Sequence, residues 1–132
     1  MAEMWVSFDL PEKPLNMNNS DGRQAMREYV ARKLVWKEAA YFATCAAFPE
    51  QGPTGRRLPP SDVRVMIPVS GKRVRDPSNW QPTVKVIVDA MVMAGCWEDD
   101  NPEFVTQHEA VLVEYPASEM LRAQVMVRVV PR

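Results

Sequence analysis

The sequence predicts a single α+β domain, spanning residues 1–132, in which a small mixed β-sheet packs with two main helices. Three observations lead to this class. The chain has 132 residues, enough for one hydrophobic core and too few for two. Segments of alternating apolar residues, typical of strands, occur together with two segments of helical period. Their order is strand, helix, strand, helix, strand, strand, which favours a sheet covered by helices.

The first two elements are a strand and a long helix. Residues 5–10 alternate roughly and are rich in strand formers. After a loop, Ser20 or Asp21 can cap a helix. Residues 49–60, with four prolines and two glycines, end this helix and form a surface loop. The helix is expected to bury a stripe of apolar residues at helical spacing: Met26, Val30, Leu34, Tyr41, Cys45 and Phe48, with Tyr29 and Trp36 near it.

Three further strands are expected. Residues 63–69 alternate β-branched residues with others, and Pro68 indicates a sheet edge or a bulge. Residues 111–115 and 122–130 have strand patterns as well. The segment 115–120 between them contains a proline and can close a hairpin, so we expect these last two strands to pair.

The second helix is apolar around nearly its whole circumference. Asn79 or Ser78 can cap it, Pro82 lies in its first turn, and Gly95 is placed to end it. Its apolar residues are Val84, Ile87, Val88, Met91 and Val92 on one stripe, and Val86, Ala90, Met93 and Ala94 on other faces. Such a helix has to be covered on nearly all sides. We therefore predict an intertwined homodimer in which a second copy of this helix supplies the cover. The alternative is that the first helix covers the remaining face.

Composition and patterning exclude several classes. With 46% hydrophobic and 25% charged residues, the chain resembles ordinary globular domains. No apolar run approaches the roughly 18 residues that a membrane span needs, and residues 1–10 lack the pattern of a signal peptide. A cytoplasmic protein is therefore expected. Cys45 and Cys96 belong to no CxxC pair, and we expect both to be reduced thiols in the core.

Charges of opposite sign are segregated along the chain, although the net charge is only −1. One basic stretch before Asp76 contains Arg56, Arg57, Arg64, Lys72, Arg73 and Arg75, and an acidic cluster further on contains Glu98, Asp99, Asp100 and Glu103. Cations can bind the phosphates of a nucleic acid, and carboxylates can bind a metal ion. The pattern is what a metal-dependent nuclease needs. The alternative is a basic loop and an acidic turn that never meet.

Three short segments carry these charges in a particular order. They read KRVRDPSN at 72–79, KVIVDA at 85–90 and AGCWEDD at 94–100. This succession resembles that of the RusA-type Holliday junction resolvases. Members of that family show basic residues, an Asp-x-Asp-Asn motif, a helix with a Lys and an Asp-Ala pair, and then Ala-Gly, an aromatic residue and Asp-Asp.

The resemblance implies a dimeric endonuclease that cuts four-way DNA junctions by paired nicks in a phage or prophage setting. It implies dependence on Mg²⁺, with Mn²⁺ as the other metal that can serve. Asp76 and Asp100 match the family's catalytic, metal-binding aspartates, and Lys85 matches its helical lysine. Asp99 is a candidate supporting ligand. Ser78 stands where the family has the second aspartate of its motif, and extra residues precede Lys85. We expect Asn79, Asp99 or Glu98, or water, to compensate for the missing carboxylate.

The chemistry also follows from the residue types. Phosphodiester hydrolysis needs an activated water and a stabilised leaving oxyanion, which a divalent cation on carboxylates supplies. A nearby lysine can neutralise charge on the phosphate, although Asp89, one turn after Lys85, can pair with that lysine instead of binding metal. We expect the basic residues beside the site, Lys72, Arg73 and Arg75, to contact phosphates. Arg56 and Arg57 either reach a DNA arm or only solvate their loop.

The helix between the two aspartates creates a geometric difficulty. A helix of roughly 15 residues is about 22 Å long, so Asp76 and Asp100 at its two ends cannot share a metal ion across a straight helix. A composite site, with Asp76 from one subunit and Asp100 from the other, is one solution. In the other, the loop 97–103 folds back along its own helix.

Two other functions are consistent with the sequence. One is a non-catalytic protein that binds branched DNA and has lost activity through Ser78. The other is a structural protein whose acidic cluster is solvated surface.

Overall fold

The computed structural model describes residues 2–15, 22–50, 55–71 and 75–132. Its elements, in order, are β1 (Met4–Asp9), α1 (Gly22–Ala47), β2 (Ser61–Ser70), the 3₁₀ turn η1 (Pro77–Trp80), α2 (Gln81–Met93), β3 (Val105–Gln107), β4 (Val111–Tyr115), the 3₁₀ helix η2 (Ala117–Arg122) and β5 (Gln124–Pro131). A mixed sheet with two main helices confirms the predicted α+β class.

The sheet has the order β1-β5-β2-β3, with β4 also paired to β2. Both β3 and β4 run parallel to β2, whereas β5 runs antiparallel to β1 and β2. A parallel pair needs a long crossover, and α2 lies within the crossover from β2 to β3. β3 was not predicted from the sequence.

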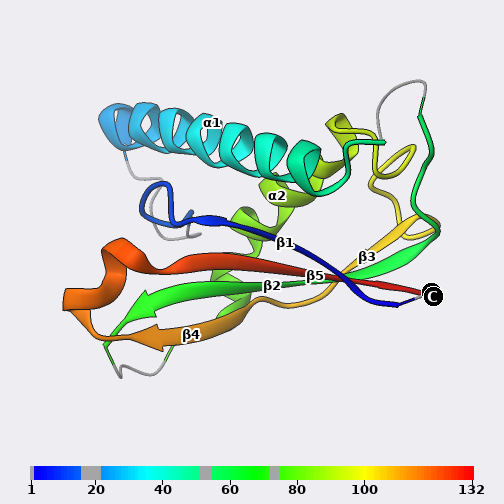
Figure 1. The fold of residues 1–132 in the computed structure, drawn as a ribbon. Coiled ribbons are helices and arrows are strands. Elements are labelled where there is room, and N and C mark those ends of the chain that lie inside the picture. Colours follow the sequence, from blue (N-terminus) through cyan, green and yellow to red (C-terminus); the bar gives the residue numbers. More distant parts are fainter. Residues whose placement is uncertain (1, 16–21, 51–54, 72–74) are drawn as a thin grey trace.

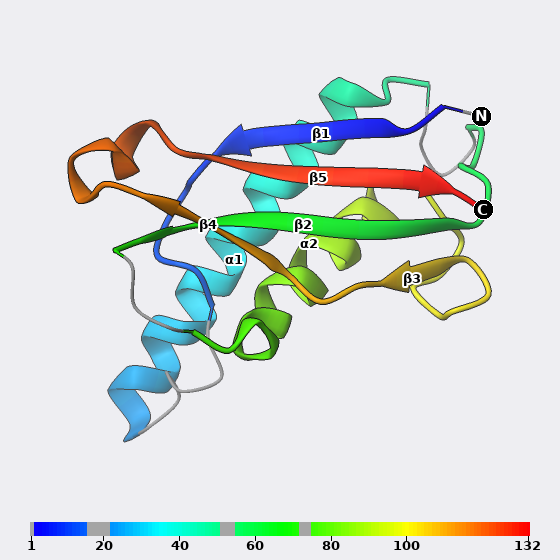
Figure 2. The same cartoon turned by 90° about the horizontal axis from the view of Figure 1, so that it is seen from below.

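The predicted hairpin between the last two strands is wrong. β4 and β5 both pair with β2, and η2 carries the chain from one to the other (Figure 2). The expectation for Pro68 holds, because the register pairs it with Val113 of β4 while the β5 pairing ends at Met66. A missing N–H therefore costs no ladder bond on the β5 side.

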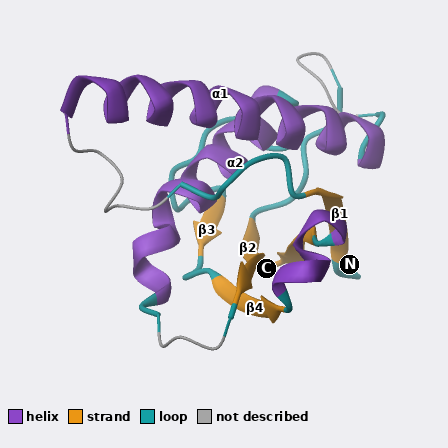
Figure 3. Cartoon of the chain, turned by 90° about the vertical axis from the view of Figure 1, so that its left-hand side faces the viewer, coloured by secondary structure: helices purple, strands orange, loops and turns teal. Residues whose placement is uncertain are grey.

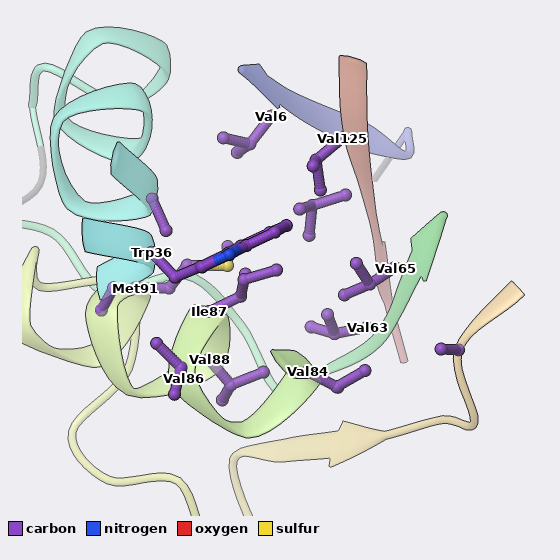
Figure 4. Close-up of a cluster of buried hydrophobic side chains, with 14 of the residues drawn as sticks. Val6, Trp36, Val63, Val65, Val84, Val86, Ile87, Val88, Met91 and Val125 are labelled. Atoms are coloured by element: carbon purple, nitrogen blue, oxygen red, sulfur yellow. The ribbon is translucent and has the colours of Figure 1, made fainter. Parts of the chain in front are cut away.

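Both helices lie on one side of the sheet, and α1 packs across α2 (Figures 1 and 3). The inward side of the sheet consists of β-branched side chains, among them Val63, Val65, Val125 and Val127, which meet Val84, Ile87 and Met91 of α2 (Figure 4). Core packing of this kind is the main stabilising contribution to such a domain.

The apolar circumference of α2 is covered within one chain. Its residues Val84, Val86, Ile87, Val88, Ala90 and Met91 are all at most 2% exposed. The sheet and α1 supply this cover, which was the alternative to a second copy. Homodimerisation therefore stays a prediction, and these buried side chains give no reason for it.

The buried face of α1 differs from the predicted stripe. Trp36, Ala40 and Thr44 face the core at 0–1% exposure, whereas Met26 and Leu34 are 45% and 62% exposed. The indole of Trp36 sets this orientation: it meets the ring of Phe8 edge-on at 6.0 Å, and its Nε1 donates to the carbonyl of Lys13. The apolar pattern predicted a different face of α1 because two of the three residues that face the core, Ala40 and Thr44, are small or polar.

The ends of α2 agree in part with the sequence. Gly95 has a φ of 98° and donates to the carbonyl of Val92, while the amide of Cys96 donates to Met91, so Gly95 ends the helix as predicted. Pro82 lies in the first turn, but α2 has no side-chain cap, because η1 leads into it.

Among the described residues, no helix combines the length and apolarity needed to cross a bilayer.

Candidate functional site

Asp76 lies between β2 and α2, where it caps η1. Its Oδ1 accepts hydrogen bonds from the amide of Ser78 at 3.0 Å and from the Ser78 hydroxyl at 2.8 Å. These two donors lower the pKa of the Asp76 carboxyl below its ordinary value of 3.8, and the hydroxyl contributes most. Ser78 thus orients Asp76 and keeps it ionised. The Asp-Pro-Ser sequence is a recognisable capping pattern, so this role of Ser78 goes beyond the loss of a motif carboxylate that the resemblance implies at position 78.

Lys85 lies in the second turn of α2 with its side chain 52% exposed. Its ammonium donates to Asp89 Oδ1 at 2.9 Å and to Asp100 Oδ2. These hydrogen bonds raise the pKa of Lys85, the one to Asp100 more strongly. The i, i+4 pairing with Asp89 was one of the two readings that the sequence left open.

The contact between Lys85 and Asp100 shows that the acidic loop folds back along its own helix. Cys96 and Trp97 anchor the loop: both are at most 1% exposed, and the Trp97 Nε1 donates to the carbonyl of Pro59 at 3.1 Å. Leu58 adds a backbone hydrogen bond to the Cys96 carbonyl at 2.7 Å. Asp100 therefore reaches the N-terminal half of α2 in a single chain, and no partner subunit is needed to bring it there.

Asp99 shapes the turn rather than facing Lys85. Its Oδ1 accepts from the amide of Asp100 at 2.8 Å, and its Oδ2 accepts from the side-chain amide of Asn101 at 3.2 Å. The adjacent Asn101 in turn accepts from the amide of Glu103 through its Oδ1. These local bonds hold the acidic loop in the conformation that presents Asp100. Asn101 was missed from the sequence, although asparagine commonly hydrogen-bonds to backbone amides in turns.

The cluster of Lys85, Asp89 and Asp100 has a net charge of −1 at neutral pH, since one ammonium faces two carboxylates. The hydrogen bond from Lys85 is the largest cause that lowers the pKa of Asp100 below 3.8. Hard oxygen donors of this kind suit Mg²⁺, which needs only one or two carboxylates and keeps several waters. The two carboxylates are thus of the donor type that suits Mg²⁺, and in this structure the Lys85 ammonium engages both of them.

The predicted three-aspartate metal site is not preassembled. Within the part of the chain that the structure describes, no three His, Cys, Asp or Glu side chains form a group able to hold a metal ion. Asp76, Asp99 and Asp100 thus do not converge as ligands, because the Asp76 carboxylate is turned to Ser78 and that of Asp99 to its own loop. The expectation that Asp76 and Asp100 share an ion stays a prediction.

The residues predicted to bind or support DNA differ in their environments. Lys72 and Arg73 lie outside the described residues, whereas Arg75 is described and donates from Nη2 to the carbonyl of Ser70. Arg57 donates to the carbonyl of Gly95 at 3.0 Å, and its positive charge interacts favourably with the C-terminal end of α2. Arg56 is exposed. Asn79 donates its backbone amide to the carbonyl of Asp76 and is part of η1.

No protein-family model matches the sequence, and no curated protein matches it. The three charged segments and the geometry of Lys85, Asp89 and Asp100 are therefore the features that point to a function.

Proposed function

We propose that this chain is a metal-dependent endonuclease of the RusA type that cuts branched DNA, with four-way junctions as its substrate. One observation carries the proposal: the acidic loop returns along α2, so that Asp100 and Asp89 meet at the ammonium of Lys85 on an exposed helix side. Paired carboxylates beside a cation suit phosphodiester hydrolysis, because charge has to be neutralised on the phosphate as the water attacks.

The residues have separate roles in this proposal. Asp100 and Asp89 would hold the metal ion. When bound, Mg²⁺ supplies a more acidic water and a counter-charge for the leaving oxyanion. Lys85 exchanges one carboxylate for a phosphate oxygen and stabilises the negative charge there. Asp76, kept ionised by Ser78, precedes the same helix and would position the attacking water.

A homodimer belongs to the same proposal. Two-fold symmetry would give two sites for two symmetric strands of a junction, which accounts for paired nicks. In this proposal each subunit forms its own cluster of Lys85, Asp89 and Asp100. The two copies associate through a surface other than the buried side of α2.

The test compares cutting with binding on a labelled four-way junction. Asp100→Asn and Asp76→Asn are expected to shift the junction in a gel as the wild type does, yet to cut it at least 100-fold more slowly in Mg²⁺. Glu119→Gln, an exposed acid in η2, is the matched control and should cut normally. EDTA should abolish wild-type cutting. Full cutting by Asp100→Asn would remove that residue from the site and refute the proposal.

A second candidate is a branched-DNA-binding protein without nuclease activity. The absence of a three-carboxylate group among the described residues favours it, together with serine at position 78. This protein would shift the junction but leave it uncut in either Mg²⁺ or Mn²⁺. Introducing the carboxylate, as Ser78→Asp, would then be expected to start cutting. If the protein bound no junction even at low salt, both functions would be excluded in favour of a structural role.

A further inference from the structure

One face of the sheet is left uncovered by the helices (Figure 2). Across its middle, three exposed side chains lie in one row on neighbouring strands. Trp5 of β1 is the cross-strand partner of Arg128 of β5, and Arg128 is the partner of Arg64 of β2. Neighbouring strands lie about 4.8 Å apart, so an indole and two guanidinium groups are side by side on this face.

The two arginines form an unusual pair. Like charges directly opposite each other destabilise a sheet unless an anion compensates them. Arg128 has such an anion, because its Nε donates to Glu3 Oε2 at 2.5 Å. Arg64 makes no ion pair with any residue that the structure describes. Nearby, His108 is engaged with Asp62 at 3.4 Å.

The row borders a shallow hollow of about 260 Å³. Its lining consists of outward-facing side chains: Asp62, Arg64, His108, Arg128 and Val130. Two of these are guanidinium groups, which match the geometry of a phosphate better than any other side chain does. The hollow therefore presents two guanidinium groups, with the Asp62 carboxylate engaged by His108, and the exposed ring of Trp5 lies beside Arg128 on the next strand, outside this lining.

We propose that the row Trp5–Arg128–Arg64 is a binding site for single-stranded nucleic acid, separate from the carboxylate cluster on α2. Arg64 and Arg128 bind backbone phosphates, and the indole of Trp5 stacks on an unpaired base. An aromatic ring can stack on a base only where that base is not already stacked in a duplex, so the row selects single strands. The proposed binding of single strands does not depend on nuclease activity.

Glu3 gives the proposal a distinctive signature. In the structure the Glu3 carboxylate accepts a hydrogen bond from Arg128 Nε, so a phosphate that binds this nitrogen has to displace Glu3. Removing that charge by Glu3→Gln frees the guanidinium and strengthens binding. Glu119→Gln removes the same charge from η2 and should not tighten binding, so a gain confined to Glu3→Gln indicates a phosphate at Arg128.

Tryptophan fluorescence reports binding at this place. Of the four tryptophans, Trp36, Trp80 and Trp97 are at most 9% exposed, whereas Trp5 is 44% exposed. Titration with oligothymidylate in EDTA should therefore quench the emission of Trp5, and Trp5→Phe should abolish the quenching. Polarisation of a fluorescein-labelled oligothymidylate measures affinity independently of the tryptophans, and circular dichroism confirms that each variant is folded.

Four variants test the row. Trp5→Ala and Arg64→Ala should each weaken binding roughly tenfold, and the latter should reduce the salt dependence by about 0.7 in log–log slope. Glu3→Gln should tighten binding several-fold. Arg27→Ala is the matched control, because it removes the same charge from an exposed site on α1, and it should leave affinity unchanged. Inorganic phosphate should compete only weakly, since it lacks a base.

Three results would overturn the inference. The first is equal affinity for oligothymidylate and for a blunt duplex of the same length. The second is an equal loss in Arg64→Ala and Arg27→Ala, which would indicate unspecific attraction. The third is unchanged affinity in both Arg64→Ala and Glu3→Gln. The nuclease proposal is tested separately by Asp100→Asn, which should bind oligothymidylate normally.

Discussion

Replacing Lys85 by methionine separates the two roles that the structure allows for this residue. The substitution removes the ammonium but keeps most of the unbranched stem, so the helix propensity and the packing of α2 are retained. It breaks both ion pairs, in which the lysine is 52% exposed and the aspartates are 33% and 30% exposed. Pairs as exposed as these are strongly screened by water, and each contributes only about 0.3–0.5 kcal/mol.

The expected loss of stability is therefore below about 1 kcal/mol. For a domain of this size, with a urea m-value of about 2 kcal/mol per molar, it corresponds to a shift of the unfolding midpoint of at most about 0.5 M. Cutting of a four-way junction should fall far more, by about 100- to 1,000-fold, because a cation that stabilises transition-state charge is lost. Lys33→Met, on the exposed surface of α1, serves as the control for both measurements.

Urea unfolding followed by circular dichroism and single-turnover cutting of a labelled junction check the two quantities. A loss of stability above about 2 kcal/mol would mean that Lys85 is a structural residue and that water does not screen its pairs as argued. Unreduced cutting would show that Lys85 neutralises no charge on the phosphate. Either result would contradict the role assigned to it here.

Three further predictions follow from single contacts. Ser78→Ala removes the hydroxyl that contributes most to lowering the pKa of Asp76, so the pKa of Asp76 should rise towards 3.8. The acidic limb of the pH–rate profile for cutting should then move to higher pH. An unmoved limb would show that Asp76 does not control it. Thr83→Val removes the 2.8 Å hydrogen bond to the buried carbonyl of Leu15 and should cost about 1–3 kcal/mol in thermal or urea unfolding, with Thr83→Ser losing less. Gly95→Ala places a side chain at a φ of 98° and should destabilise the fold by about 1–2 kcal/mol, whereas a neutral effect in the same unfolding assay would show that the end of α2 can rearrange.

The local features of α2 could be predicted from the sequence because their causes lie within a few residues. Pro82 fits the first turn and Gly95 supplies the left-handed residue that ends the helix. The i, i+4 spacing of Lys85 and Asp89 allowed their pairing, which the sequence left open beside metal binding by Asp89. Each of these expectations required no knowledge of what packs against the helix.

Strand pairing could not be predicted in the same way. β4 and β5 are close in sequence and have the pattern of a hairpin, yet both pair with β2 because η2 carries the chain past the end of that strand. β3 is only three residues long, too short for an alternating pattern to identify it. The choice of partner depends on the whole sheet, which periodicity within one segment does not encode.

In the candidate site, too, local contacts could be predicted from the sequence, whereas contacts between residues distant in the chain could not. The position of Asp100 beside Lys85 depends on Trp97, whose indole is anchored to Pro59, 38 residues earlier in the chain. No spacing rule within the acidic segment contains that contact. The capping of η1 by Asp76, in contrast, involves residues two apart, and its sequence pattern was available.

The place of β5 in the sheet has a consequence for how the protein is made. β5 lies between β1 and β2 but follows both in the sequence, and Gln124 of β5 meets Asp9 of β1 across 115 positions. While the ribosome is still translating the segments before β5, β1 has emerged without the neighbour it pairs with in the finished sheet. Closing such long loops is slow, so β1 joins the sheet only after synthesis has passed residue 131, and until then nascent β1 is open to chaperones and to pairing with other chains.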